Sequence, residues 1–477
     1  MIYPMNFDLT PQQRQELWSE LFNHLESYYA HTSELPVSPE LDREKIVALV
    51  EKYSLGEGTG PGQAIAHVVE GLSRYAVHTP HPMYYGLFNP RAAFPGILAD
   101  AITAAFNPQM AAWSHNPFAN EVENFLVREL GEKFGFPKEK IDGVFASGGA
   151  EANLTAVLCA LNHHFPEYAN AGLAGIGKRP VMYCSAESHH SVIRAGRISG
   201  MGLDAVRPIP VDGRQRMQPE LLSRQIEKDR AEGFYPFLAI ATAGATGTGA
   251  IDPIPEIAGI AERHGLWLHV DAAYGGAVIL DEEKKHLLKG IEKAHSITFD
   301  AHKWLSVPMG AGLFLTREPD ILSRSFRITA DYMPKEAQGL PVTDPFTHSI
   351  QWSRRFIGLK LYLSLLFFGW EGYGQAIKRQ CRMGDLLKEE LQKNGWKMYN
   401  DTELPIACFM DPGHEQTPGF ARAVCDRVLE SGKAWISVYP VSKLETLRAC
   451  ITNYATGEKE VLELVALLNA CRKEYLM

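Results

Sequence analysis

Short, uninterrupted apolar runs recur through the middle of the chain, each bounded by turn residues and followed by a longer amphipathic segment. Apolar runs that alternate with helical segments are typical of a parallel sheet covered by helices on both faces, because both faces of each strand are then buried. We therefore predict an α/β fold with a mostly parallel central sheet. The predicted strands are GVFA (143–146), PVMYC (180–184), FLAIAT (237–242), LWLHV (266–270) and SITF (296–299).

The pattern differs at the two ends of the chain, whose 477 residues are too many for one small core. The first part has apolar positions at helical spacing, and the last part alternates helical stretches with the strand-like runs LPIACFM and TLRACITN. We expect an N-terminal helical segment (1–85), a large domain (86–375) and a small C-terminal α+β domain (376–477). The helices expected in the two end parts cover residues 11–30, 40–52, 376–393, 418–431 and 458–475.

Composition excludes several classes of protein. The net charge of −9 argues against nonspecific nucleic-acid binding, and seven scattered cysteines predict reduced thiols rather than disulfides or a zinc site. The first residues lack the basic start and apolar run of a secretory signal. The longest apolar run, LKLYLSLLFFGW (359–370), is too short to cross a membrane, so we expect a core helix there. The prediction is a cytoplasmic protein with no metal, nucleic-acid or membrane partner.

Two charged residues follow predicted strands closely. Asp271 ends the run LWLHVD, and Lys303 follows SITF within the motif DAHKW. In parallel sheets, ligands bind beyond the carboxyl ends of the strands. A lysine that can form a Schiff base, together with a carboxylate that can pair with a pyridinium nitrogen, is what pyridoxal 5′-phosphate requires. We predict that Lys303 carries this cofactor and that Asp271 pairs with its ring, which small Ala273 allows to come close.

Three further segments supply the other parts of such a site. In ASGGAEAN (146–153), small residues between a strand and a helix predict a phosphate site at the helix N-terminus, with the backbone N–H groups of Gly149 and Ala150 as donors and Ser147 nearby. The turn GATGT (244–248) adds the hydroxyl of Thr246. In SAESHHSVIRAG, we expect the flat ring of His189 to lie on the face of the cofactor.

The motifs ASGGAEAN, HHSVIRAG, HVDAAYGG and DAHKWL, in this order and spacing over about residues 78–370, resemble those of the group II pyridoxal-phosphate-dependent amino-acid decarboxylases. The resemblance implies the aspartate-aminotransferase fold (fold type I). It also implies a homodimer with sites at the subunit interface, the N-terminal helices packing on the partner. The expected activity is the release of CO₂ and an amine from an L-amino acid.

The resemblance also implies residue roles. It supports those given above for Lys303, Asp271 and His189, and it makes His302 the histidine beside the lysine. Tyr332 matches the loop tyrosine that protonates the carbon left by CO₂, and Arg355 falls where the family has an arginine pair. One position departs from the pattern. Asp300 stands where related animal enzymes have an asparagine that helps to hold the phosphate, and a carboxylate there is repulsive.

The substrate is less constrained than the reaction. We expect Phe88, Gln109, Trp113 and Arg355 to contact it and an aromatic amino acid to be preferred, although Gln109 and Ala111 replace the larger apolar groups of aromatic-selective relatives. An acidic substrate is the alternative if Arg91 faces the pocket. Other readings are a carbon–carbon lyase of the phosphosphingosine or aldol type, a transaminase and a catalytically inactive scaffold. Against the lyase, Trp304–Leu305 follow the lysine where such lyases have Tyr-Gly.

Overall fold

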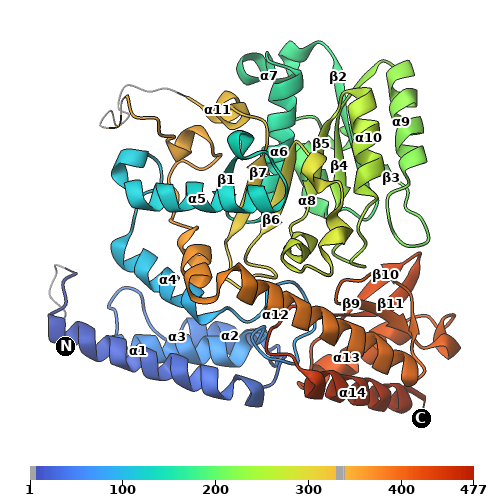
Figure 1. Ribbon diagram of the computed structural model, residues 1–477. Coiled ribbons are helices and arrows are strands. Elements are labelled where there is room, and N and C mark those ends of the chain that lie inside the picture. Colours follow the sequence, from blue (N-terminus) through green and yellow to red (C-terminus); the bar gives the residue numbers. More distant parts are fainter. Residues whose placement is uncertain (1–6, 329–336, 338, 477) are drawn as a thin grey trace.

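A seven-stranded sheet forms the centre of the molecule, with strand order β1-β7-β6-β5-β4-β2-β3 (Figure 1). The computed structural model describes residues 7–328, 337 and 339–476. β7 is antiparallel to both β1 and β6, and the other neighbours are parallel, so the predicted α/β class is confirmed. The strands are β1 (Asp142–Ala146), β2 (Arg179–Ser185), β3 (Val206–Ile209), β4 (Phe234–Thr242), β5 (Trp267–Asp271), β6 (Ser296–Asp300) and β7 (Gly312–Thr316).

Both faces of this sheet are buried, as the continuous apolar runs require. In β4, Leu238 and Ile240 join one apolar cluster, while the alternating residues Ala239 and Ala241 join the other. The five predicted strands correspond to β1, β2, β4, β5 and β6. Two strands of this sheet were not predicted: the short edge strand β3 and the antiparallel strand β7.

Helices cover both faces of the sheet, whereas the helices within residues 11–75 lie apart from it beside the N-terminus (Figure 1). The first of these is capped by Thr10, whose side chain accepts a hydrogen bond from the backbone N–H of Gln13. The helices are α1 (Pro11–His31), α2 (Arg43–Val50), α3 (Pro61–Tyr75), α4 (Phe94–Phe106), α5 (Pro117–Lys133), α6 (Gly149–His164), α7 (Tyr168–Ile176), α8 (His190–Ile198), α9 (Pro219–Ala231), α10 (Ile254–His264), α11 (Ile321–Phe326), α12 (Leu359–Lys393), α13 (Phe420–Glu430) and α14 (Glu458–Leu476).

The C-terminal part contains a second, antiparallel sheet of four strands in the order β10-β11-β9-β8. The segment that follows the N-terminal helices is part of the apolar core of this second sheet. The Tyr85 N–H donates to the carbonyl of Trp435, and the Cys450 N–H donates to the carbonyl of Tyr85, each at 2.9 Å. The strands are β8 (Lys397–Met398), β9 (Ile406–Met410), β10 (Ser437–Val441) and β11 (Leu444–Cys450).

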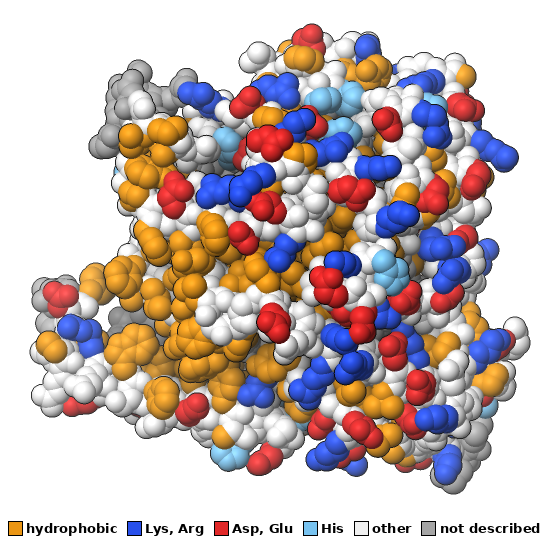
Figure 2. Space-filling view, in the orientation of Figure 1, with side chains coloured by type: hydrophobic (Ala, Val, Ile, Leu, Met, Phe, Trp, Pro, Cys, Tyr) orange, Lys and Arg blue, Asp and Glu red, His pale blue; other side chains and the backbone are white. Residues whose placement is uncertain are grey.

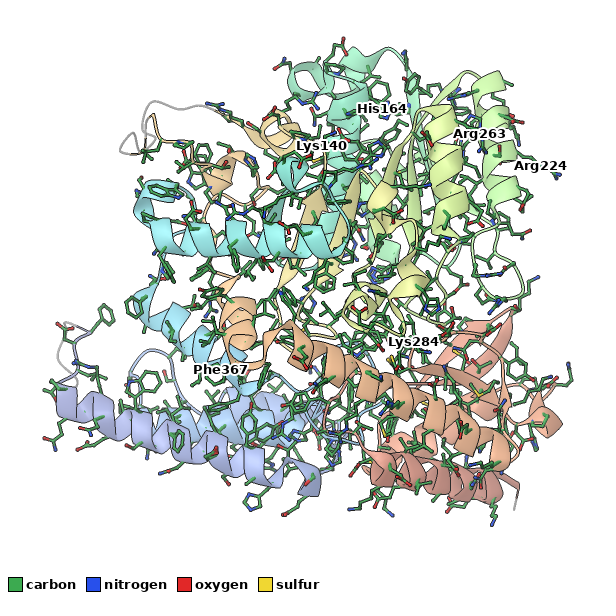
Figure 3. The ribbon with its side chains drawn as sticks, viewed as in Figure 1. Lys140, His164, Arg224, Arg263, Lys284 and Phe367 are labelled. Carbon is green, nitrogen blue, oxygen red and sulfur yellow. The ribbon has the colours of Figure 1, made fainter. Side chains whose placement is uncertain are left out.

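The longest apolar run forms the first turns of α12, but only part of it is core. Leu361 and Ser364 are buried, whereas Leu366, Phe367 and Phe368 are 63%, 59% and 48% exposed. The prediction of a core helix over 359–370 is therefore wrong for its second half. The exposed side chains belong to an apolar area in the region of α4 and α12 (Figure 2), and Phe367 projects outward there (Figure 3). Within the described residues, every helix is too short or too polar to span a bilayer.

A buried ion pair joins α5 to the start of α12. The Arg354 guanidinium donates to both carboxylate oxygens of Glu123, at 3.0 and 2.7 Å, and the Gly358 N–H donates to the same carboxylate at 2.9 Å. Both side chains are less than 10% exposed. Because a buried charge without its partner is costly, this pair holds the segment between the large sheet and α12 in place.

We expect Glu123→Gln to lower the free energy of unfolding by about 3–5 kcal/mol, because Arg354 would keep its charge in a buried position without a counter-ion. Chemical denaturation measures the change. The matched control is Glu70→Gln in the exposed pair of Glu70 with Arg74, which should cost less than about 1 kcal/mol. Equal losses in the two variants would contradict the stabilising role of the buried pair.

Candidate active site

A cavity of about 330 Å³ opens where the carboxyl ends of β1, β2, β4, β5 and β6 converge. This is the edge of the sheet at which ligands of α/β proteins bind. Ten residues that were predicted to form the site line this cavity, and they come from five separate segments of the chain. They are Ser147, Gly149, Ala150, His189, Thr246, Asp271, Ala273, Asp300, His302 and Lys303.

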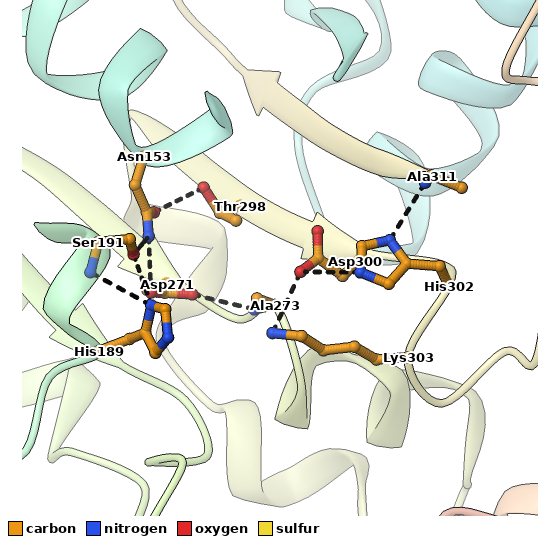
Figure 4. Close-up of polar contacts among 10 residues, drawn as sticks. All are labelled: Asn153, His189, Ser191, Asp271, Ala273, Thr298, Asp300, His302, Lys303 and Ala311. Carbon is orange, nitrogen blue, oxygen red and sulfur yellow. Dashed lines mark hydrogen bonds and ion pairs between the residues drawn. The ribbon is translucent and has the colours of Figure 1, made fainter. Parts of the chain in front are cut away.

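Asp271, at the end of β5, is held as a hydrogen-bond acceptor on the floor of this cavity (Figure 4). It is 6% exposed, and its two oxygens accept from Asn153 Nδ2 at 2.8 Å and from the Ala273 N–H at 3.2 Å. Asn153 is fixed in turn, because its amide oxygen accepts from the hydroxyl of Thr298 at 2.9 Å. These donors hold both carboxylate oxygens in fixed positions, so the floor of the cavity carries an oriented acidic side chain.

His189 stands beside Asp271 at the start of α8. Its Nδ1 lies 3.3 Å from the Ser191 N–H and accepts its hydrogen, so the ring carries its own hydrogen on Nε2 when it is neutral. Burial lowers the pKa of His189, and the neighbouring His190 lowers it further. The ring is therefore neutral at pH 7, flat and free to lie against an aromatic ligand.

Lys303, Asp300 and His302 form a charged group opposite Asp271 (Figure 4). Lys303 Nζ is 3.1 Å from Asp300 Oδ2, and His302 Nε2 is 3.8 Å from the same oxygen. The Ala311 N–H donates to His302 Nδ1 at 3.1 Å, and burial lowers the pKa of this histidine. The neutral ring thus presents its Nε2–H toward Asp300. Of the two acidic side chains, Asp300 rather than Asp271 is the one paired with the lysine.

The start of α6 forms one wall. Because the helix begins at Gly149, the backbone N–H groups of Gly149 and Ala150 have no partner inside the helix. A side chain at Gly149 would lie 2.9 Å from Asp300 Oδ2, so glycine lets the helix end approach this carboxylate. The Ser147 hydroxyl donates to Glu151 at 2.7 Å, and Glu151 also accepts from Gln351 at 2.6 Å.

The opposite wall is fixed by Arg448 of β11, which is 2% exposed. Its guanidinium donates to the carbonyl oxygens of Gly86, Thr246 and Gly247 at 2.8–3.1 Å. These bonds shape the 244–248 turn, whose Thr246 lines the cavity. Phe88 lies close by, stacked on Tyr274 at 4.0 Å, with Lys303 Nζ 5.8 Å from its ring centre.

Other predicted residues are not in this cavity. Gln109 and Arg355 line a separate cavity of about 560 Å³, and Arg355 is paired with Asp100 at 3.1 Å. The Trp113 indole donates to Glu121 at 2.9 Å. Within one chain, the described lining of the Lys303 cavity therefore includes none of the four expected substrate contacts, although the Phe88 ring lies 5.8 Å from Lys303 Nζ. Tyr332 lies outside the described residues.

The sequence analysis did not identify several residues that form the site. Asn153 lies within the motif ASGGAEAN, yet its contact with Asp271 joins residues 118 positions apart. Ser191 and Thr298 complete the same network, with Ser191 2.9 Å from Asn153 Nδ2. The alternation of β6 places Thr298 and Asp300 on one face of the strand, which is a signal that could have found Thr298.

Comparison with known proteins agrees with this geometry. Residues 60–411 match the pyridoxal-dependent decarboxylase conserved domain. The chain is 28% identical to an aromatic-L-amino-acid decarboxylase of Bacillus atrophaeus, covering 98% of this chain and 97% of that protein. It is 31% identical to the acidic amino acid decarboxylase GADL1 of Bos taurus, over 80% of this chain and 75% of that protein. The crystal structure of mouse CSAD superimposes with a TM-score of 0.90 at 26% identity, covering 97% and 99% of the two chains.

The fold and the site define a pyridoxal-phosphate enzyme of fold type I. The chain belongs to the pyridoxal-dependent decarboxylase family, the group II amino-acid decarboxylases, and its reaction is the decarboxylation of an amino acid.

The cavity fits this cofactor. Free N–H groups at the start of α6 suit a phosphate, the buried Asp271 suits a pyridinium nitrogen, and Lys303 Nζ reaches the space between them. Asp300 is the exception, since a carboxylate beside these N–H groups would compete with a phosphate for the same positive helix end.

We expect Asn153→Asp to weaken cofactor binding at least about tenfold, because a second carboxylate against Asp271 removes a donor and forces the two acids to share a proton. Titration with pyridoxal phosphate, followed by its lysine-dependent visible absorbance, measures the affinity. Asn162→Asp on the same helix is the control, since among the described residues Asn162 donates to the Leu158 carbonyl of its own helix rather than to a cavity residue. An unchanged affinity in Asn153→Asp would show that Asn153 does not support Asp271.

Proposed function

We propose that the enzyme decarboxylates an aromatic L-amino acid to the corresponding amine. The supporting observation is the charge of the cavity wall. Among the described lining residues, Lys303 is the only lysine or arginine, and the cofactor requires it. An acidic substrate would bring a second carboxylate into a buried site and would need another cation.

Three arginines that were candidates for binding an acidic substrate or that lie beside the 244–248 turn are engaged elsewhere. Arg91, which would have favoured an acidic substrate, lies over the ring of Tyr29 at 4.8 Å. Arg448 is bonded to backbone carbonyls, and Arg355 is paired with Asp100. The lining of the cavity instead includes the exposed Met309 and the ring of Tyr274, on which Phe88 is stacked from behind. These surfaces suit an uncharged, flat side chain.

The proposed mechanism assigns each step to a residue. When bound, pyridoxal phosphate supplies an electron sink for the pair left behind by CO₂. Lys303 would hold the cofactor's aldehyde carbon before the reaction and would release the amine afterwards. Asp271, held in position by its two donors, would hold a proton on the ring nitrogen. The neutral ring of His189 would lie on the cofactor face, and Tyr332 would protonate Cα.

Two further sets of residues would hold their neighbours in place without transferring a proton. The N–H groups of Gly149 and Ala150, with Thr246 and Ser147 near, would bind the phosphate. Ser147 would first have to release Glu151, because its hydroxyl now donates there. His302 would remain neutral beside Lys303 and orient Asp300 through Nε2–H.

We expect kcat/KM for the best of phenylalanine, tyrosine and tryptophan to exceed that for glutamate, aspartate and cysteine sulfinate by at least about a hundredfold, since a buried unpaired carboxylate costs several kcal/mol. The measurement is CO₂ and amine release by the cofactor-loaded enzyme, with Lys303→Ala as the inactive control. Faster turnover of an acidic substrate would exclude the aromatic preference. Cleavage without CO₂ would favour the lyase alternative.

We also propose a homodimer, formed through the apolar area of α4 and α12. In α4, Phe94, Ile102 and Phe106 are 45%, 42% and 82% exposed, next to Leu366 and Phe367 of α12. A surface with this many exposed large apolar side chains is typical of an interface. Gln109 lies three residues after the end of α4, so pairing through this surface would place it at the interface, where the family resemblance implies that the sites lie.

We expect Phe367→Asp to convert the dimer to monomer at micromolar concentration, because a carboxylate would be buried without a partner in the interface. Analytical ultracentrifugation measures the mass. Ile198→Asp, at an equally exposed apolar position on α8, is the control and should leave the mass unchanged. A monomeric wild-type protein, or a dimeric Phe367→Asp variant, would contradict this interface.

A further inference from the structure

A series of buried hydrogen bonds runs from the interior of the sheet to the floor of the cavity. It begins at Trp267 of β5, whose indole N–H donates to the Ser296 hydroxyl oxygen of β6 at 2.8 Å. Ser296 is also 2.8 Å from Nδ1 of His269, and Nε2 of the same ring is 3.1 Å from Oδ1 of Asn153. These four side chains are at most 1% exposed, so the series lies wholly inside the protein.

The direction of these hydrogen bonds is fixed at the cavity end. Nδ2 of Asn153 lies 2.8 Å from the Asp271 carboxylate. If the amide were turned around, its oxygen would lie against a carboxylate oxygen, and two acceptors would face each other. Oδ1 of Asn153 therefore faces the interior and needs donors. The Thr298 hydroxyl is one of them, at 2.9 Å, and the Nε2–H group of His269 is the other.

His269 carries a single ring hydrogen, because burial lowers its pKa to about 4 and the ring is neutral at pH 7. With this hydrogen on Nε2, Nδ1 is an acceptor and takes the hydrogen of the Ser296 hydroxyl. The Ser296 oxygen in turn accepts the Trp267 N–H. The opposite tautomer would place a bare ring nitrogen against the Asn153 oxygen, so the neighbours of His269 select one form of the ring.

The second hydrogen of the Asn153 amide continues the series toward the cavity (Figure 4). Nδ2 also lies 2.9 Å from the Ser191 hydroxyl oxygen, whose own hydrogen is then directed at Nδ1 of His189, 2.8 Å away. This bond and the Ser191 N–H both need an Nδ1 without a hydrogen in His189. One amide group therefore supports both the acid on the cavity floor, Asp271, and the ring beside it.

We propose that His269 is a positioning residue of the active site. By donating from Nε2, it holds the Asn153 amide with its nitrogen toward the cavity, and it thereby fixes the orientation of Asp271 and the tautomer of His189. His269 is not among the described residues that line the cavity, so its effect on a bound cofactor passes through Asn153. The inference rests on the proposed function, in which Asp271 and His189 contact pyridoxal phosphate.

The test compares two substitutions of His269 by their affinity for pyridoxal phosphate, followed by its lysine-dependent visible absorbance. His269→Gln keeps an N–H donor close to the position of Nε2 and should bind the cofactor within about threefold of wild type. His269→Leu has no donor and should bind it at least about tenfold more weakly, because the Asn153 amide is then free to turn. Packing alone would favour leucine over a buried amide. Equal affinities in the two variants, or tighter binding by His269→Leu, would overturn the proposal.

A second measurement applies even if His269→Leu does not fold. In the cofactor-free wild-type protein labelled with 15N-histidine, His269 and His189 should both give the nitrogen shifts of the neutral Nε2–H tautomer at pH 7. Each signal is assigned by its loss in the corresponding glutamine variant. An Nδ1–H tautomer in either ring would contradict the proposed direction of the hydrogen bonds.

His81→Leu is the matched control for the loss of a buried histidine. His81 is also bonded through both ring nitrogens, to the Met83 N–H at 2.9 Å and the Ser33 carbonyl at 3.2 Å, but it lines a different cavity. It should keep the wild-type affinity, and a loss equal to that of His269→Leu would refute the specific role of His269. A wild-type protein without lysine-dependent absorbance would instead refute the proposed function, while the nitrogen shifts would still test the tautomers.

Discussion

The hydrogen bond between Asn153 and Asp271 joins the parts of the molecule that make the cavity. It connects the first turns of α6 to the end of β5, and through Thr298 and Ser191 it reaches β6 and the start of α8. Asn153, Ser191, Thr298 and Asp271 are 1%, 3%, 0% and 6% exposed, so the network is buried beneath the cavity. A buried network of this kind is stable only when every member is satisfied, and this one therefore fixes the relative positions of four elements.

Much of the fold could be predicted because its strands are buried on both faces. LWLHV and FLAIAT are continuous apolar runs, which parallel strands require and exposed antiparallel strands do not. The same reasoning missed β7, because the position and the reversed direction of GLFLT depend on its pairing with β1 and β6 at once. It also predicted a core helix at 359–370. Apolar content alone does not distinguish a helix that is buried within the chain from one that exposes apolar side chains such as Phe367.

The site residues that could be predicted are those that lie at or just after the carboxyl end of a strand. Lys303, Asp271 and His189 each follow a strand whose carboxyl end faces the cavity, so their meeting follows from the sheet. The placement of Gln109 and Arg355 could not be derived in this way, because helices and loops far from the sheet carry them. Arg448 was missed for a related reason: it lies in β11, and only the docking of the second sheet brings it to the 244–248 turn.

The bonds of Arg448 limit how this protein can move. Its guanidinium donates to the carbonyls of Gly86, Thr246 and Gly247, so one side chain of the C-terminal sheet holds two loops of the large domain. A rotation of that sheet away from the cavity would leave several carbonyl groups and a buried guanidinium unpaired. The two sheets therefore behave as a single rigid frame, and admission of an amino acid has to come from side chains and loops at the cavity mouth rather than from a hinge between domains.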